Sequence, residues 1–511
     1  MAGGVCRCLV SVVKVSMDTL LYVLLAIVYL IPTVGLMAYG LNCYVMLYLF
    51  CRRLREAANA RRQIQAEMGD VLARADLPVV TTQIAVYNEI NVVERVIRAV
   101  CAIRYPREKH EIQVLDDSTD GTCAVVDRLA IEFRAQGFDI QVLRRRVRTG
   151  FKGGALAEAL AVARGELVAV FDADFVPPAD YLSSMVPFFL RDPKLGFAQA
   201  RWGHLNRRQS LLTRAQAIGI DGHFIVEQVA RSWNSLFMNF NGTAGIWRRT
   251  AIVAGGGWQW DTLTEDLDLS YRVQFAGWTT LYLPDLVVPA ELPETVAAFR
   301  TQQFRWAKGS FQTLLKHFGQ LRREKCSWFK KMEAVLHMSG YGVHPLMLAL
   351  SLLALPMLLL TQHHPLPYWL FAMLALPLAL SILGPSTLYV WAQCVVDRRR
   401  GWKSVLWMPV LMFVGIGLAI SNTRAIVQAI RGHESEFVRT PKRGDKEVTR
   451  YCGGFAMIAL VEMAMGVYSL YTVHVYLHNG RFGVVPFLML YAAGYLFMGM
   501  LSISQAVRVR S

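Results

Sequence analysis

A polar stretch in the middle of this apolar chain carries the side chains best suited to chemistry. It begins with Thr-Glu-Asp at 264–266 and ends with Gln-Gln-Phe-Arg-Trp at 302–306. In a helix, Gln302, Arg305 and Trp306 stand at i, i+3 and i+4, so an amide, a guanidinium and an indole share one face. That trio suits a pyrophosphate leaving group beside a sugar ring. For the pentapeptide alone, an interfacial helix with Arg and Trp at the lipid headgroups is the alternative.

Two acidic clusters lie upstream, and each follows an apolar run. Asp116-Asp117-Ser118 ends one run and Phe171-Asp172-Ala173-Asp174 ends another. The charge of a diphosphate leaving group must be neutralised by a divalent metal or by basic groups. Asp172 and Asp174 offer the hard oxygen ligands that suit Mg²⁺ or Mn²⁺. The alternatives are two solvated acids after a strand and, for Asp117, ordinary turn chemistry.

The elements that must position these acids form a predicted α/β domain. Strands that alternate with helices imply a mostly parallel sheet, and such sheets bind ligands beyond the carboxyl ends of their strands. Tyr87-Asn88-Glu89 and both acidic clusters fall at those ends. One amphipathic helix is expected over residues 91–103. The expected strands are Val79–Val86, Ile112–Leu115, Ile140–Leu143 and Leu167–Phe171.

The composition places part of the chain in lipid. Of 511 residues, 54% are hydrophobic and only 18% are charged, which is too apolar for an ordinary soluble protein. The net charge of +16 could suggest a nucleic-acid partner, but the basic residues gather beside apolar spans, as at 51–55 and 397–400. That placement follows the positive-inside rule and argues against nucleic acid. Apart from Cys6-Arg7-Cys8, the nine cysteines show no paired spacing, so we expect reduced thiols.

Five apolar stretches are long enough to cross a bilayer, which takes about 20 helical residues. Pro32 leaves a helical hairpin as an alternative for the first. A further stretch, Ser404–Ile420, would leave several basic residues outside if it crossed, so we expect an interfacial or re-entrant helix there. The five stretches are Met17–Phe50, Ser339–Leu360, Leu366–Cys394, Phe455–Tyr476 and Phe482–Leu501.

The predicted organisation has three parts. Residues 1–50 form an N-terminal transmembrane helix, and residues 51–330 form the α/β domain with interfacial helices. Residues 331–511 form a transmembrane region with an interfacial helix over 404–430 and a loop over 433–446. The basic residues after the first span predict a cytoplasmic α/β domain. We expect a multi-pass protein of a plasma (inner) or Golgi-type membrane, in contact with membrane lipid, and the sequence identifies no partner subunit.

Four motifs in the order D, DxD, TED and QxxRW resemble those of the processive membrane glycosyltransferases of family 2, the cellulose synthase and cellulose synthase-like group. The likeness is closest to the A and C types, covers roughly residues 75–445, and includes 240–245 and 291–294. Four separated motifs that agree in order and spacing make it specific. It implies an α/β nucleotide-sugar-binding domain of the GT-A type plus an α-helical transmembrane region.

The resemblance also implies an activity. Members of this group are inverting hexosyltransferases that move a sugar from UDP-glucose or GDP-mannose to a growing β-glycan, with translocation across the membrane. The A type uses GDP-mannose and the C type uses UDP-glucose, and the motifs do not separate them. The partners expected are therefore a nucleotide sugar and a polysaccharide acceptor, or a glycolipid acceptor if the chain adds one sugar to a membrane lipid.

Residue roles follow from the same resemblance. Asp266 is the general base, a role that needs a positioned carboxylate because a sugar hydroxyl has a pKa far above neutrality. Helix capping is the structural alternative for Asp266. Asp174 is the metal ligand, and Lys152, near a helix start, could meet phosphate together with the backbone amides. The nucleotide-sugar residues are Tyr87, Asn88, Glu89, Asp117, Lys152, Asp172 and Asp174.

The acceptor side completes the expected site. Trp306 would stack on the acceptor sugar, and Gln302 with Arg305 would hold acceptor and diphosphate. The acceptor-binding residues are Asn241, Gly242, Glu265 and Trp306. Residues 437–442 resemble the gating loop of the group, with Phe437, Thr440 and Lys442 in place. Arg439 and Pro441 depart from the cellulose synthase pattern, so an ordinary basic loop beside the membrane remains an alternative for this segment.

Other classes of protein fit less well. A transporter or channel would explain the spans, but it has no need of four ordered acidic motifs in a large α/β domain. A nucleic-acid binder would explain only the charge. Among enzymes, a transferase that adds one sugar to a membrane lipid is the nearest alternative to a glycan synthase. Several spans follow the QxxRW motif, which favours the synthase.

Overall fold

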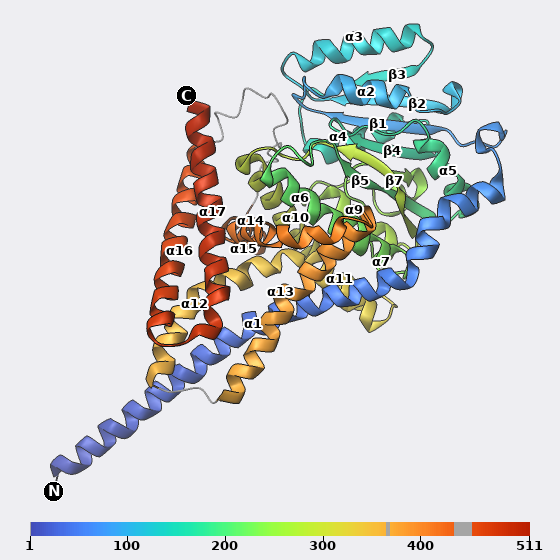
Figure 1. Cartoon of the computed structure of the whole chain (residues 1–511). Helices are drawn as coiled ribbons and strands as arrows, with labels where there is room; N and C mark the ends of the chain where they lie inside the picture. The colour runs from blue at the N-terminus through green and yellow to red at the C-terminus, as the bar shows by residue number, and fades with distance from the viewer. Residues whose placement is uncertain (1, 364–367, 434–451, 511) are drawn as a thin grey trace.

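The computed structural model describes residues 2–363, 368–433 and 452–510 of the chain. An α/β domain stands at one end, and long helices extend from it, with α10, α11, α14 and α15 between the two parts (Figure 1). The helices of the α/β domain are α2 (Val93–Cys101), α3 (Thr122–Ala135), α4 (Phe151–Val162), α5 (Tyr181–Arg191), α6 (Leu211–Asp221), α7 (Gln228–Ser232), α8 (Arg249–Ala254) and α9 (Glu265–Phe275).

A seven-stranded sheet forms the centre of this domain, in the order β3-β2-β1-β4-β6-β5-β7. Only β6 runs antiparallel to its neighbours β4 and β5, so the prediction of a mostly parallel sheet is confirmed. The strands are β1 (Val80–Val86), β2 (His110–Asp116), β3 (Asp139–Leu143), β4 (Leu167–Asp172), β5 (Leu195–His204), β6 (Gly245–Arg248) and β7 (Thr279–Ala290).

The register of the parallel strands brings the acidic motifs together. Val86 of β1 pairs with Asp116 of β2, and Ala85 of β1 pairs with Asp172 of β4. The carboxyl ends of β1, β2 and β4 therefore meet at one edge of the sheet, because parallel strands point the same way. The expectation that both acidic clusters lie at one edge is met.

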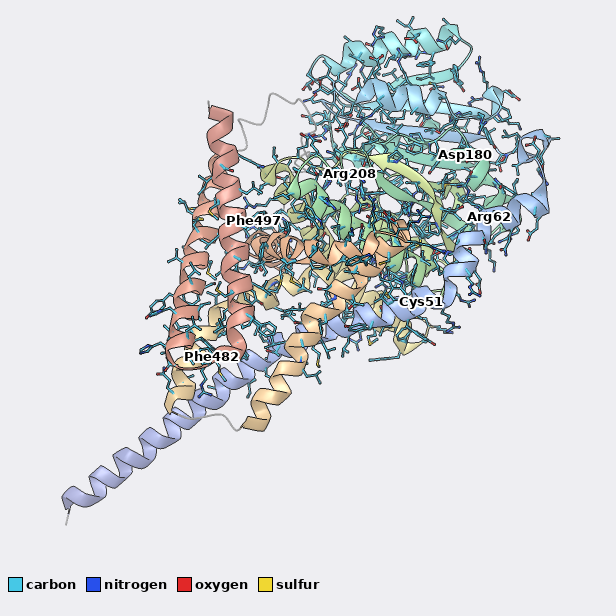
Figure 2. All side chains as sticks on the ribbon, viewed as in Figure 1. Cys51, Arg62, Asp180, Arg208, Phe482 and Phe497 are labelled. Carbon is cyan, nitrogen blue, oxygen red and sulfur yellow. The ribbon has the colours of Figure 1, made fainter. Side chains whose placement is uncertain are left out.

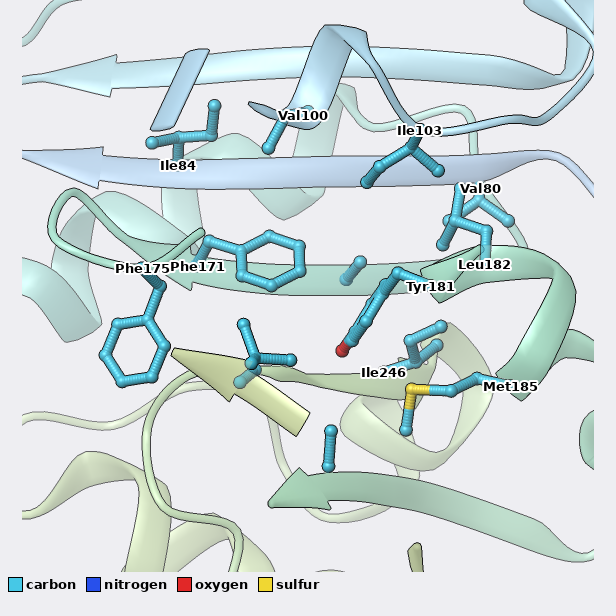
Figure 3. Packing of buried hydrophobic residues seen from close by; sticks show 14 of the residues in the cluster. Val80, Ile84, Val100, Ile103, Phe171, Phe175, Tyr181, Leu182, Met185 and Ile246 are labelled. Atoms are coloured by element: carbon cyan, nitrogen blue, oxygen red, sulfur yellow. The ribbon is translucent and has the colours of Figure 1, made fainter. Parts of the chain in front are cut away.

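Buried apolar side chains hold the helices against the sheet. β4 carries five buried residues before Asp172, as expected for a strand covered on both faces. Phe171 of β4 packs edge to face on Tyr181 of α5, with 5.0 Å between ring centroids. Val80 and Ile84 of β1 lie in the same cluster (Figure 3). This packing makes the strand that carries the acidic pair part of a rigid core.

Within the described residues, five helices are long and apolar enough to cross a membrane. This number agrees with the five spans expected from the sequence. Residues 401–430 form two helical segments bent by 42°, which suits a broken or re-entrant segment. The remaining helices are α1 (Ala2–Met68), α10 (Val296–Arg323), α11 (Trp328–Met338), α12 (Val343–His363), α13 (Tyr368–Val396), α14 (Met408–Gly417), α15 (Ala419–Ile430), α16 (Cys452–His478) and α17 (Val485–Arg510).

The first helix joins the two parts of the molecule. α1 continues without a break through Pro32 and reaches Met68, so it is one helix and not a hairpin. Near its carboxyl end, Arg61 donates to Asp180 over 3.0 Å and lies 3.6 Å from Asp285, both in the α/β domain. Figure 2 shows this end of α1 beside the α/β domain, while the α16 and α17 hairpin stands apart.

Candidate active site

One pocket opens at the carboxyl ends of the parallel strands. It brings together residues from all four sequence motifs, which are up to about 190 positions apart in the chain. The predicted site residues that line it are Tyr87, Glu89, Asp117, Lys152, Asp172, Asp174, Asn241, Gly242, Glu265, Asp266, Gln302, Arg305 and Trp306.

Lys152 ties the acidic pair to the loop before β6. Its ammonium donates to the Asp172 carboxylate over 2.5 Å and to the Gly242 carbonyl over 2.7 Å. Burial works against the charged form of Lys152, but the carboxylates around it, Asp172 first, outweigh burial and raise its pKa. Lys152 is the second residue of α4, so it lies inside the start of the helix and not just before it. It is a fixed positive charge facing the pocket.

Gly242 makes room for the predicted base. Its φ of +77° is a left-handed conformation that favours glycine. A Cβ atom at this position would lie 2.9 Å from Oδ2 of Asp266. Any side chain at residue 242 would therefore press on the Asp266 carboxylate. The two predicted acceptor and base residues are adjacent in space although 24 positions apart in sequence.

The environment of Asp266 suits proton transfer. Burial and the neighbouring Glu265 carboxylate raise the pKa of Asp266 to about 7, despite the opposing charge of Lys152. A base is most effective when its pKa lies near the working pH. Thr264, not Asp266, occupies the cap position of α9, and Asp266 is the second residue of that helix. Capping therefore does not account for Asp266.

One face of α10 forms the opposite wall. Gln302, Arg305 and Trp306 all lie in α10 and all line the pocket, so the predicted shared helical face is present. Burial lowers the pKa of the Arg305 guanidinium, and nearby carboxylates, Glu265 first, partly offset this effect. Trp306 stands 6.4 Å from Trp202, between ring centroids, with the rings inclined by 53°. Two indoles therefore lie together on the side of the pocket where the acceptor is predicted.

The same face of α10 continues beyond the pocket and packs against residues 263–268, the segment that carries the predicted base. A Cβ atom on Gly309 would lie 2.5 Å from Cγ2 of Thr264, so only glycine allows this close approach. One turn further, the Gln312 side chain accepts from the Leu263 amide over 3.0 Å. Then His317 donates to Asp268 over 2.7 Å. The helix that carries the predicted acceptor platform thus also fixes the start of α9.

Sequence reasoning missed the arginines around Asp117. Arg145 donates to both oxygens of Asp117, over 3.0 and 2.5 Å. Arg148 lines the pocket and stacks on Tyr87, with its guanidinium carbon 3.5 Å from the ring centroid. Both belong to a basic run after β3, at the same sheet edge as the acids. Basic residues at a strand's carboxyl end were a signal that could have found them.

A second missed residue is Arg95 of α2. It donates to Glu291 over 2.8 Å and to the backbone carbonyl of Asp174 over 3.3 Å. Glu291 belongs to the Glu-Leu-Pro-Glu segment and lines the pocket. Arg95 therefore joins that segment to the acidic pair. Its place on the amphipathic helix predicted over 91–103 gave no sign of this contact in the sequence.

One predicted residue within the described part of the chain does not line the pocket. Asn88 is absent from its lining, and its side chain accepts from the Thr119 amide over 2.8 Å in a turn with a φ of +53°. Asn88 thus shapes the loop that carries Tyr87 and Glu89. The predicted gating residues Phe437, Thr440 and Lys442 lie outside the described residues.

The acidic pair fits a divalent cation that is shared with a substrate. Among the described residues, no group of three or more His, Cys, Asp or Glu side chains is arranged to hold a metal. Mg²⁺ and similar ions, however, are often held by one or two carboxylates, with substrate phosphates and water completing the shell. Asp174 is 4% exposed, and it lines the pocket together with Asp172. The donor set is hard oxygen, as such an ion requires.

Comparison with known proteins agrees with this geometry. Residues 78–309 match the family model described as "Glycosyltransferase like family 2". "Glucomannan 4-beta-mannosyltransferase 7" of Arabidopsis thaliana is 34% identical over 413 residues, which cover 78% of this chain and 72% of that protein. The chain belongs to glycosyltransferase family 2. Within it, the chain is a member of the cellulose synthase-like group, as the motifs predicted.

Further relatives of this glycosyltransferase carry similar names. "Glucomannan 4-beta-mannosyltransferase 9" of Arabidopsis thaliana is 33% identical, over 78% of this chain and 76% of that protein. "Probable glucomannan 4-beta-mannosyltransferase 7" of Oryza sativa subsp. japonica is 43% identical, over 46% of this chain and 41% of that protein. Mannosyltransferase PcManGT from Pyrobaculum calidifontis, solved with GDP-Man and Mn²⁺, is 21% identical and covers 78% of this chain and 100% of that chain, with a TM-score of only 0.47.

Membership confirms the coarse predictions. The chain is a membrane hexosyltransferase of family 2 that uses a nucleotide sugar to make a β-glycan. Its predicted fold class, an α/β domain of GT-A type with an α-helical membrane region, is also confirmed. The roles of individual residues, the donor and the passage of product through the membrane stay predictions.

Proposed function

We propose that this glycosyltransferase transfers mannose from GDP-mannose to the end of a growing β-1,4-linked glycan and passes the product through the membrane. The relatives' names support the sugar and the linkage. The observation that carries the proposal is the single pocket in which Asp117, Asp172, Asp174, Asp266 and Trp306 meet. UDP-glucose is the second donor to test, because the sequence motifs suit both nucleotide sugars.

The donor would lie along the carboxyl ends of β1, β2 and β4. Its base would lie near Asp117 and the stacked Tyr87 and Arg148 side chains, which offer planar surfaces. Its diphosphate would face Lys152 and the amino end of α4, where a cation and backbone amides both favour an anion. Asp174 would hold Mg²⁺ or Mn²⁺, which balances the charge of the departing diphosphate.

Proton transfer would fall to Asp266. The acceptor hydroxyl attacks the anomeric carbon of the donor, the bond from that carbon to the diphosphate breaks, and the hydroxyl proton passes to the Asp266 carboxylate. Attack from the face opposite the leaving group inverts an α-linked donor into a β-linked product. Lys152 and Arg305, both facing the pocket, would stabilise the negative charge on the leaving diphosphate.

The acceptor would lie on the α10 side of the pocket. Trp306 presents an aromatic plane to a sugar ring, with Trp202 beside it. Asn241 and Gly242 line the same side, and Glu265 is buried next to the base. Helices α12 and α13 extend away from the α/β domain (Figure 1), which supports a role for the membrane helices as the exit for the product. A cytoplasmic active site in a plasma or Golgi-type membrane accords with the basic residues that flank the spans.

The test supplies inverted membrane vesicles with radiolabelled GDP-mannose, UDP-glucose and other nucleotide sugars. We expect ethanol-insoluble polymer from GDP-mannose, degraded by an endo-β-1,4-mannanase. Vesicles that contain the Asp266→Asn variant are the control for background synthesis. Polymer from UDP-glucose alone would contradict the donor. A chloroform-soluble glycolipid with one sugar, and no polymer from any donor, would show that the enzyme is a lipid glycosyltransferase and not a glycan synthase.

A further inference from the structure

A polar network leads from the pocket toward the membrane helices. The Gln228 side chain donates to Oδ1 of Asn241 over 2.6 Å, which turns the Asn241 amide nitrogen toward His223 Nε2, 3.2 Å away. The other ring nitrogen of His223, Nδ1, then donates to Glu227 over 2.8 Å. Asn241 lines the pocket, so the network begins in the active site and ends at a carboxylate.

The segment that carries this pair has an unusual backbone. His223 and Glu227 lie in η3 (Gly222–Glu227), a π-helical turn that follows α6. Such turns are rare and are often found at functional sites. η3 contacts both α1 and α13, and a Cβ on Gly222 would lie 2.5 Å from the ring of Tyr389 in α13. The pair therefore stands where the α/β domain meets the membrane helices.

Only one face of η3 is open. Gly222, Phe224, Ile225 and Val226 are buried. The His223 and Glu227 side chains, four positions apart, keep 25% and 34% of their surface accessible. Burial works to raise the pKa of Glu227, but the hydrogen bond from His223 leads the effects that outweigh burial and lower that pKa. A carboxylate held ionised on an accessible face can accept further hydrogen bonds.

We infer that Glu227, oriented by His223, is a sugar-binding subsite for the glycan acceptor. This inference rests on the proposed function. Both nitrogens of the imidazole are engaged by Asn241 and Glu227, so the carboxylate is the group that faces the ligand. Sugar hydroxyls donate to carboxylates, and a neutral polyol can enter between membrane helices where an ion cannot. The subsite lies beyond Asn241 and His223, on the side of the pocket that faces the membrane helices. It holds the sugar that precedes the one under transfer.

This placement gives Glu227 a role in holding the chain after each addition. Asn241 lines the pocket and is bonded to the same imidazole that orients Glu227. Loss of the carboxylate should therefore weaken the hold on the acceptor more than it slows the chemical step. The predicted signature is a raised KM for acceptor and shorter products.

The experiment uses the full-length protein in lipid nanodiscs and titrates it with β-1,4-mannohexaose, then with cellohexaose. Glu227→Gln preserves the shape of the side chain and removes its charge. We expect about tenfold weaker binding of mannohexaose, a similar rise in acceptor KM, a smaller fall in kcat and a shift to shorter polymer. GDP affinity should not change. Glu56→Gln, an exposed carboxylate paired with Arg53 on α1, is the matched control and should behave as wild type.

Three outcomes would overturn the inference. They are equal hexaose affinity for the wild type and Glu227→Gln, no hexaose binding by the wild type, and loss of GDP affinity together with hexaose affinity. If Glu227→Gln does not fold, His223→Gln is the second variant, and a smaller change in the same direction is expected. The proposed function fails separately, by the absence of polymer from the wild type with any donor, whatever the binding titration shows.

Discussion

Asp266 and Asp268 stand two residues apart in α9 and face two different regions. Asp266 faces the pocket, and burial together with Glu265 raises its pKa to about 7. Asp268 lies behind the pocket and is fully buried. Burial works to raise the pKa of Asp268 as well, but its basic partners, His317 first, outweigh burial and lower it to about 2.

The difference lies in the partners of each carboxylate. His317, Lys316 and Arg272 surround Asp268, at distances of 2.7, 2.9 and 2.7 Å. Among the described residues, Asp266 makes no salt bridge. A buried acid surrounded by cations is held ionised and serves as a structural anchor, whereas a buried acid beside another acid is poised to take up a proton. The front of α9 therefore suits proton transfer, and the back suits positioning of the helix.

The largest effect is expected when the front carboxylate is neutralised. Asp266→Asn is nearly isosteric and removes the base, so kcat should fall by about 100-fold or more while nucleotide affinity is kept. Initial rates of sugar transfer and a GDP titration measure the two quantities. If nucleotide affinity falls together with the rate, Asp266 belongs to the donor site instead.

Next in size is loss of the metal. Chelation of divalent cations, or Asp174→Asn, should remove most turnover while the protein stays folded in the membrane, because the leaving diphosphate then lacks its counter-charge. The measurements are transfer rate and thermal unfolding in the same samples. Addition of excess Mg²⁺ or Mn²⁺ should restore the chelated wild type but not the variant. Full activity in excess chelator would contradict the metal.

A third test compares two positions on one face of α10. Trp306→Ala removes the platform at the pocket, so polymer synthesis should fall at least tenfold while slow hydrolysis of the donor to water continues. His317→Ala, three turns further along, should leave the ratio of transfer to hydrolysis near that of the wild type. Equal ratios for the two variants would show that the pocket end of this α10 face does not differ from the end that contacts Asp268.

A fourth test removes the anchor at the back. Asp268→Asn leaves buried cations without their counter-charge, so the protein should lose about 3 kcal/mol or more of stability. The rate of molecules that remain folded should fall by less than tenfold. Denaturant or thermal unfolding measures the stability, and the transfer rate per folded enzyme measures the effect on the reaction. A rate loss as large as that of Asp266→Asn, without loss of stability, would assign Asp268 to the chemistry.

The smallest effect is a difference in pH dependence. Below pH 7, the ionised fraction of Asp266 should fall about tenfold per pH unit, and kcat with it. For stability the two acids have opposite signs. Asp266 holds its proton longer in the folded state, so stability falls as pH rises from about 4 to 7. Asp268 holds its charge longer, so its stabilisation is lost as pH falls from about 4 to 2.

Unfolding curves of the wild type and both variants over this range measure these slopes. Asp266→Asn should remove the fall in stability between pH 4 and 7 and leave the loss of stability between pH 4 and 2. Asp268→Asn should do the reverse. If both variants remove the pH dependence of stability over the same pH range, the two carboxylates titrate as one group. The contrast between the front and back of α9 would then be wrong.

The sequence by itself determined the architecture and the chemical groups. Buried strands are visible in the sequence as short apolar runs, because both faces of a parallel sheet are covered. Membrane spans are visible as long apolar stretches, because lipid offers no hydrogen bonds to the backbone and the chain must cross it as a helix. The helical spacing of Gln302, Arg305 and Trp306 was enough to place them on one face, since that geometry is local. Four ordered motifs then identified the family.

Only the tertiary structure decided what surrounds each group. Asp266 and Asp268 are both acids near a helix start in the sequence. Burial and the adjacent Glu265 raise the pKa of Asp266, whereas the distant His317 and other basic partners outweigh burial and lower the pKa of Asp268. Arg95 and Arg148 join the site through contacts that no spacing encodes. The path from Asn241 to Glu227 likewise depends on which segments meet in space. Burial and charge act through distance, and distances between remote segments are set by the fold.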